Sequence, residues 1–107
     1  MAVNQKTILK EITLLLKLKM PENFVKTVLF GSRLTNQGKP DSDYDILIIV
    51  KEKADWKAER KISDTCYEIE LKFNVAIDLH ILSEPEINSR RGQQPIFVNA
   101  LLHGNSL

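Results

Sequence analysis

Residues 31–50 read GSRLTNQGKPDSDYDILIIV, and this stretch decides the fold. It begins at a glycine that ends an apolar run, passes through turn-forming Asn, Gly, Pro and Asp residues, and finishes in the run Tyr44–Val50. Gly, Pro, Asn and Asp favour turns, whereas β-branched and aromatic residues favour strands. The stretch therefore predicts two strands around a turn, and the ten-residue spacer 33–42 suits an antiparallel pair.

The flanking sequence predicts helices on both sides of this pair and a third strand. Apolar residues recur three and four apart in 7–19 and in 54–73, which indicates amphipathic helices. Phe24–Phe30 and 75–82 are strand-like, and 84–103 holds one or two short helices. A strand, a helix of about five turns and a strand form a parallel crossover. We expect an α/β or α+β domain with a small mixed sheet flanked by helices.

The composition is that of one ordinary globular domain. The chain has 107 residues, 43% of them hydrophobic, and a formal net charge of +1. DNA- and RNA-binding domains usually carry a basic excess on one face, so this charge argues against a nucleic-acid partner. The one cysteine, Cys66, excludes a disulfide framework and Cys/His zinc spacing. Neither a signal peptide nor a membrane-spanning run is visible, so we expect a cytoplasmic protein without a membrane partner.

Two acids, Asp43 and Asp45, stand at the start of the second predicted strand. Side chains two residues apart in a strand point to the same face, so these carboxylates project together while Tyr44 points into the core. Two carboxylates this close repel each other, and one takes up a proton unless a cation lies between them. Mg²⁺ prefers oxygen ligands, typically one or two carboxylates and substrate phosphates. The pair therefore predicts half of a metal site.

A third acid, Asp78, lies in the middle of the third predicted strand. The odd-numbered positions of this strand are apolar and should face the core, so Asp78 faces the other way, together with His80. If this strand lies beside the second one, Asp78 joins Asp43 and Asp45. Three carboxylates can hold two metal ions about 3.5–4 Å apart, which stabilises both oxygens of an in-line phosphoryl displacement. For His80, a hydrogen-bonded structural role and a catalytic role both stay open.

Residues 31–33 suit the phosphate end of the same reaction. Gly31 at the end of a strand lets the backbone approach a phosphate closely. Successive backbone N–H groups in such a turn form an anion-binding nest. The Ser32 hydroxyl can donate to a phosphate oxygen, and Arg33 can add a charged, forked donor. These residues predict a site for a nucleoside triphosphate.

Together, these motifs resemble the nucleotidyltransferase signature of the polymerase-beta-like superfamily: Gly31-Ser32, a spacer of ten, Asp43-x-Asp45 and a later strand acid, Asp78. The resemblance covers about residues 24–82, and 95–104 is similar to the family's closing helix. The short length resembles the minimal nucleotidyltransferases, single-domain members often paired with a small helical HEPN protein. The resemblance implies a palm-like fold and one nucleotidyltransferase domain over residues 1–107.

By position, the resemblance implies that Gly31 and Ser32 bind the triphosphate and that Asp43, Asp45 and Asp78 hold two Mg²⁺ ions. Asp78 would also help to activate the acceptor hydroxyl. The expected reaction is transfer of a nucleoside monophosphate, AMP from ATP, to a hydroxyl. A chain of this length leaves no separate domain to grip an antibiotic, a tRNA or a primer, so we expect a protein hydroxyl, such as a tyrosine of a HEPN-type partner.

Two alternatives stay open. The first is a non-catalytic, antitoxin-like module that neutralises a partner by contact, with the apolar stretch 96–102 as a candidate surface. The second is a transferase directed at nucleic acid, against which the near-neutral charge argues. The sequence leaves the base preference undecided, as well as the oligomeric state, a homo-oligomer included.

Overall fold

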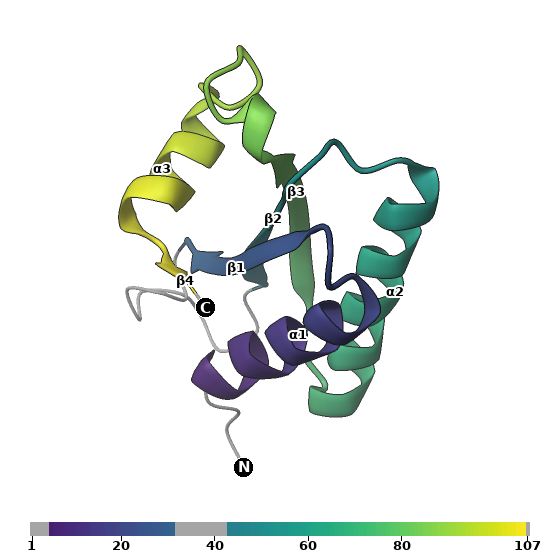
Figure 1. Cartoon of the computed structure of the whole chain (residues 1–107). Coiled ribbons are helices and arrows are strands. Elements are labelled where there is room, and N and C mark those ends of the chain that lie inside the picture. Colours follow the sequence, from purple (N-terminus) through teal and green to yellow (C-terminus); the bar gives the residue numbers. More distant parts are fainter. Residues whose placement is uncertain (1–4, 32–42, 107) are drawn as a thin grey trace.

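The computed structural model describes residues 5–31 and 43–106, which form a sheet with helices on both faces (Figure 1). In chain order the elements are α1 (Gln5–Lys19), β1 (Phe24–Phe30), β2 (Tyr44–Val50), α2 (Trp56–Phe73), β3 (Ile77–Ser83), the 3₁₀ turn η1 (Glu84–Glu86), α3 (Pro95–His103) and β4 (Asn105–Ser106). Among these, no helix is long and apolar enough to cross a membrane.

The sheet is mixed, with the strand order β3-β2-β1-β4. β1 pairs with β2 in antiparallel fashion, and β2 pairs with β3 in parallel fashion across the α2 crossover. Both pairings are those that the sequence predicts. The expected α+β fold with a small mixed sheet and flanking helices is confirmed. Since β3 is an edge strand, one of its sides carries no neighbouring strand among the described residues.

The two faces of the sheet carry separate apolar cores. α1 and α2 cover one face, where Ile8, Ile12 and Leu16 of α1 meet Ile46 and other side chains of the sheet. α3 covers the other face through Phe97 and Ala100, which pack with a second cluster: Val28, Phe30, Leu47, Ile49 and Leu82. β2 therefore contributes buried side chains to both faces, which explains its unbroken apolar run.

The predicted limits of β1 and β2 agree with the structure, whereas those of α2 and β3 shift by about two residues. α2 begins at Trp56 because the Asp55 carboxylate accepts a hydrogen bond from the Ala58 N–H and caps the helix. It ends at Phe73, and the following residue Asn74 caps it with a left-handed φ of 53°. The next residues are tied to the helix end, since the Ile77 N–H donates to the Glu70 carboxylate, so β3 begins at Ile77.

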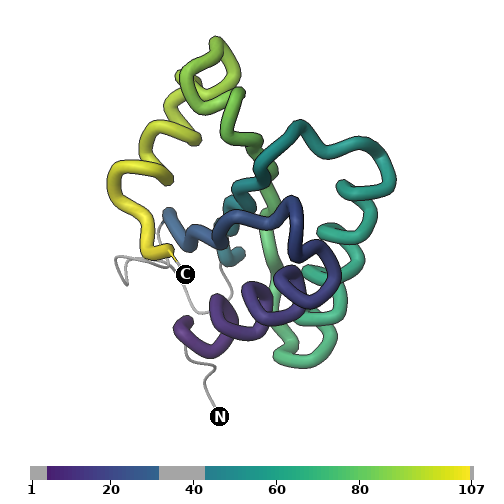
Figure 2. Tube along the Cα trace, in the orientation of Figure 1, coloured from purple at the N-terminus to yellow at the C-terminus, as the bar shows by residue number. Residues whose placement is uncertain are grey.

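The sequence does not predict β4, the two-residue strand that follows α3. It pairs with β1, where Val28 lies opposite Ser106, and the yellow end of the trace in Figure 2 runs back to this edge. Gly104 joins α3 to β4 with an ordinary negative φ of −77°. A Cβ at Gly104 would collide with the side chain of Val28, so a glycine is needed here for close packing.

Candidate active site

Two of the predicted acids lie side by side at one end of the sheet. In the parallel β2–β3 ladder Asp45 is the register partner of Asp78, and in the antiparallel ladder it lies opposite Phe30. The end of β1 and the starts of β2 and β3 therefore meet at the same edge. Phe30 belongs to the core under α3, so the Asp45 and Asp78 side chains emerge on the α3 face of the sheet.

Asp45 is only partly exposed, and its surroundings oppose its charge. Burial raises the pKa of the Asp45 carboxyl above its ordinary value, and the Asp78 charge and a hydrogen bond with the Asp78 carboxyl raise it further. The charge of Asp43 adds to this effect, and His80 opposes it. Two carboxylates this close repel each other when both are charged, so the space between them suits a cation.

His80 completes a three-residue cluster with Asp45 and Asp78. One ligand atom of each residue lies within 4.8 Å of the others. The His80 Nε2 atom is 3.4 Å from Asp78 Oδ2, yet it is buried and makes no hydrogen bond with residues 5–31 or 43–106. The imidazole lies near two aromatic rings, with centroid distances of 5.7 Å to Phe30 and 6.3 Å to Phe97. The ring is therefore held by packing, with its nitrogen beside the carboxylates.

Gly31 closes the cluster from the side of β1. Its φ of 85° is a conformation that residues with a side chain rarely adopt. A Cβ built on it would collide with the Asp45 carboxylate. The glycine that the sequence assigns to phosphate binding therefore also makes room for Asp45.

The other predicted site residues differ in what the structure describes. Asp43 is exposed, directly before β2, and belongs to no group of three with ligand atoms within 4.8 Å among the described residues. Ser32 and Arg33 lie outside the described residues. His80 is the residue whose role the sequence left open, although its position two residues after Asp78 already placed both on one face of the strand.

The cluster fits a divalent cation. Two carboxyl groups in contact and an orphaned imidazole nitrogen are oxygen and nitrogen donors of the kind that divalent metals take. A cation among them would offset the repulsion of the carboxylates and satisfy all three donors at once. Asp45, Asp78 and His80 are thus able to hold a metal ion.

A hollow of about 380 Å³ runs along the open edge of β3 and reaches the cluster at His80. Lys53 and Arg91 contribute positive charge, and Glu59 and Glu86 negative charge. Arg91 is fixed there, since it donates to the Ile81 carbonyl at 3.0 Å and lies 5.0 Å from the centre of the Phe97 ring. Arg91 therefore forms part of the wall of the hollow.

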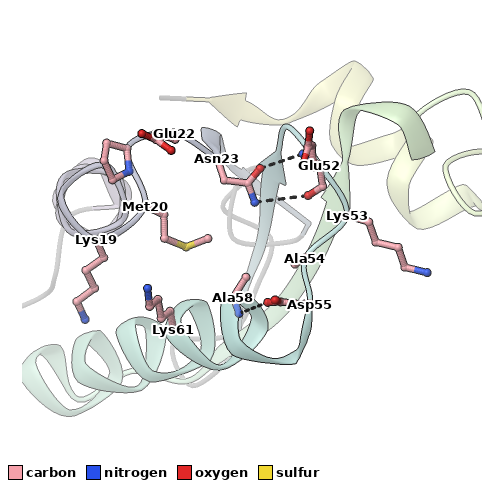
Figure 3. A pocket seen from close by; sticks show the side chains of 11 residues that line it. Lys19, Met20, Glu22, Asn23, Glu52, Lys53, Ala54, Asp55, Ala58 and Lys61 are labelled. Atoms are coloured by element: carbon pink, nitrogen blue, oxygen red, sulfur yellow. Dashed lines mark hydrogen bonds between the residues drawn. The ribbon is translucent and has the colours of Figure 1, made fainter.

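A second hollow, of about 420 Å³, opens at the far end of the sheet between α1 and α2 (Figure 3). In its wall the Asn23 side chain makes two hydrogen bonds with the backbone of Glu52. The start of α2, capped by Asp55, also lines this hollow. The hollow follows β2, whereas Asp45 is near the start of that strand; the seven residues from Asp45 to Glu52 span about 23 Å at ~3.3 Å each. This hollow contains none of the predicted site residues.

The comparisons with known proteins agree with this geometry. The family model described as "Polymerase beta, Nucleotidyltransferase" matches residues 10–93, which include Gly31 and all three acids. No curated protein and no solved structure matches the chain. The match spans most of the chain and runs from the middle of α1 to just before α3. The chain belongs to the polymerase beta-type nucleotidyltransferase family.

Proposed function

We propose that this nucleotidyltransferase transfers AMP from ATP to a protein hydroxyl in a Mg²⁺-dependent reaction. The observation that carries the proposal is the pairing of Asp45 with Asp78 in the β2–β3 register, packed against Gly31. This pairing puts two carboxylates beside Gly31, the first residue of the candidate triphosphate site. The family match supports the reaction type.

The residues divide the work by position. Asp43, Asp45 and Asp78 would hold two Mg²⁺ ions, which would supply charge neutralisation at the phosphates. Gly31, Ser32 and Arg33 bind the triphosphate. The Asp78 side chain is 54% exposed, so an acceptor can reach it.

The bond changes follow from this arrangement. The acceptor oxygen forms a bond to the α-phosphorus, and the bond between that phosphorus and the α,β-bridging oxygen breaks. Pyrophosphate leaves with the electron pair of the broken bond, and the Asp78 carboxylate accepts the proton of the hydroxyl. Since the groups are held in place, positioning supplies most of the rate.

The proposed acceptor is a tyrosine hydroxyl on a small helical partner of the HEPN type. The surface offers apolar groups for such a partner, at the i, i+4 spacing of one helix face. Leu14 and Leu18 of α1 are 55% and 79% exposed, and Tyr67 and Leu71 of α2 are 59% and 67% exposed. Exposed side chains of this kind support a protein-protein contact.

The test is label transfer from α-phosphate-labelled ATP with Mg²⁺ in a lysate of the source cells. We expect a labelled protein band with the wild-type chain and none with Asp78→Asn. Asp64→Asn is the matched control, because Asp64 is an exposed acid of α2 away from the sheet end, and it should label like wild type. An equally strong band with Asp78→Asn would overturn the proposal.

A second candidate function is neutralisation of a partner by contact alone. The same exposed apolar residues favour it, together with Ile96 and Leu102 of α3, which are 38% and 71% exposed. The opposite face of the stretch 96–102 is buried in the protein itself, since Phe97 and Ala100 pack on the sheet. Partner control that survives Asp43→Asn combined with Asp45→Asn would favour contact, and control lost with the acids would favour catalysis.

A further inference from the structure

We propose that His80 is a nitrogen ligand, through Nε2, of the cation held by Asp45 and Asp78, and that this nitrogen makes the site prefer Mn²⁺ to Mg²⁺. The inference rests on the metal site of the proposed function but is independent of the nucleotide and of the acceptor. The family resemblance assigns the metal to three aspartates, so a histidine ligand is a property of this chain.

The first argument is the distance between donor atoms. In a six-coordinate site with bonds of about 2.1 Å, neighbouring ligand atoms lie about 3 Å apart and opposite ones about 4.2 Å. The His80 Nε2 and Asp78 Oδ2 atoms are 3.4 Å apart, and the donor atoms of all three residues lie within 4.8 Å of one another. Small side-chain movements bring the set to the spacing of ligands around one ion.

The second argument is that Nε2 has no hydrogen-bond partner among the described residues. The atom is buried, although buried polar atoms in proteins are nearly always paired. At 3.4 Å its contact with Asp78 is longer than a charge-assisted hydrogen bond, which is ~2.7–2.9 Å. A metal ion between the nitrogen and the carboxylates would satisfy all of these groups.

The third argument is that the imidazole is already oriented. Phe30 lies beside the ring at a tilt of 51°, and Phe97 meets it edge-on at 90°. His80 follows Asp78 by two residues on a strand that is itself paired with β2, so the backbone fixes the separation of the two ligands. A pre-oriented ligand loses little conformational freedom when it binds the ion.

Ligand chemistry then determines which ion is preferred. Mg²⁺ takes oxygen ligands almost exclusively and keeps several waters. Imidazole favours first-row transition metals, and Mn²⁺ accepts carboxylate oxygens together with nitrogen. Two carboxylates with one imidazole therefore shift the preference from Mg²⁺ to Mn²⁺, because the nitrogen adds a bond that Mg²⁺ uses poorly.

The experiment measures metal binding by the full chain, without nucleotide or acceptor. Mn²⁺ is titrated alone and in competition with Mg²⁺ into the wild type, His80→Gln and His103→Gln. His103 is the other histidine of the chain, exposed at the end of α3, and serves as the matched control. We expect His80→Gln to weaken Mn²⁺ binding about tenfold or more and Mg²⁺ binding much less, and His103→Gln to behave like wild type.

A second measurement does not depend on any variant being folded. In pulsed electron paramagnetic resonance of Mn²⁺ bound to the wild type, a coordinated imidazole produces nitrogen modulation of the spin echo. We expect this modulation in the wild type and in His103→Gln, and its loss in His80→Gln. Mn²⁺ bound without nitrogen modulation would overturn the inference, as would equal weakening of both ions by His80→Gln, which is the result for a residue that only positions the carboxylates.

The outcomes also separate this inference from the proposed function. Mn²⁺ and Mg²⁺ bound with equal strength through Asp45 and Asp78 would overturn the role of His80 and leave the transferase proposal standing. Nitrogen modulation together with no labelled acceptor in the lysate assay would support His80 as a ligand and count against the transfer reaction.

Discussion

Gly31 lies so close to the carboxylate of Asp45 that a side chain at position 31 would occupy the same space. Asp45 belongs to β2, and Gly31 directly follows the antiparallel neighbour β1, just after the Phe30–Asp45 pair that ends the ladder. The absence of a side chain at Gly31 therefore leaves the space that the Asp45 carboxylate occupies. Several properties of the site depend on this contact.

Gly31→Ala should lower both stability and transfer activity. The left-handed backbone at φ 85° alone costs a residue with a Cβ about 1–2 kcal/mol, and the collision with Asp45 adds to this cost. Urea unfolding of Gly31→Ala, Asp45→Ala and the double variant measures the two parts. In the double variant the collision is removed, so its free energy of unfolding should show only the backbone cost of the alanine in addition to the effect of Asp45→Ala. Strictly additive losses would show that the two residues do not interact.

Asp45→Asn should stabilise the metal-free protein at neutral pH while abolishing transfer. Burial, followed by the neighbouring Asp78 carboxyl, raises the pKa of Asp45 above its unfolded value of 3.8. The folded state therefore favours the protonated acid, and the free energy of unfolding falls as pH rises from below 3.8 through the folded pKa. An uncharged amide removes this loss.

Denaturant unfolding in a metal chelator at pH 3.5 and pH 7 checks the prediction. The gain from Asp45→Asn should be present at pH 7 and small at pH 3.5. Asp43→Asn, at the exposed neighbouring acid, is the control and should change stability less. A variant that is less stable than wild type at pH 7 would show that the charged carboxylate is compensated in the folded state.

Glu86→Gln should weaken the link between β3 and α3. Burial by itself would raise the pKa of Glu86, but hydrogen bonds from the side chain and backbone N–H of Ser83, together with the charges of Arg91 and Lys53, lower it below its ordinary value of 4.5. Stabilisation by this carboxylate is therefore present above pH 4.5 and is lost as pH falls through the folded pKa.

The expected cost at pH 7 is about 1 kcal/mol, the usual value of a helix-capping interaction. Thermal or urea unfolding at pH 7 and pH 3 measures it, and the difference from wild type should shrink at the lower pH. Glu84→Gln is the control, since Glu84 is exposed in the same turn and makes no described bond through its side chain. A pH-independent difference would argue against the charged cap.

Cys66 should react with thiol reagents only when the protein opens. Burial, and next the charge of Glu70, raises the pKa of the thiol to about 12, so the reactive thiolate is scarce at neutral pH. Its side chain lies in the core between α2 and the sheet, 3% exposed. We expect labelling by a disulfide reagent to be far slower than that of a free thiol and to accelerate in urea. Rapid labelling in buffer would show that α2 detaches locally from the sheet.

The sequence by itself determined the elements and the candidate acids. β1 and β2 have the predicted limits because each is rich in β-branched and aromatic residues and is bounded by turn residues. The α2 crossover required β3 to be parallel to β2, and alternation placed Asp78 and His80 on one face. These features follow from the spacing of apolar residues and from turn-forming residues, both of which are properties of neighbouring positions in the chain.

Only the tertiary structure decided which side chains meet. The β2–β3 register aligned Asp45 with Asp78, and a shift by one residue would have sent the two acids to opposite faces. The packing of Phe97 from α3 brought His80 into the cluster, and the antiparallel β1–β2 ladder set Gly31 against Asp45. The two-residue strand β4 formed only because β1 offered an open edge. The physical reason is that these contacts join segments far apart in the chain, so they depend on register and packing, which no local pattern contains.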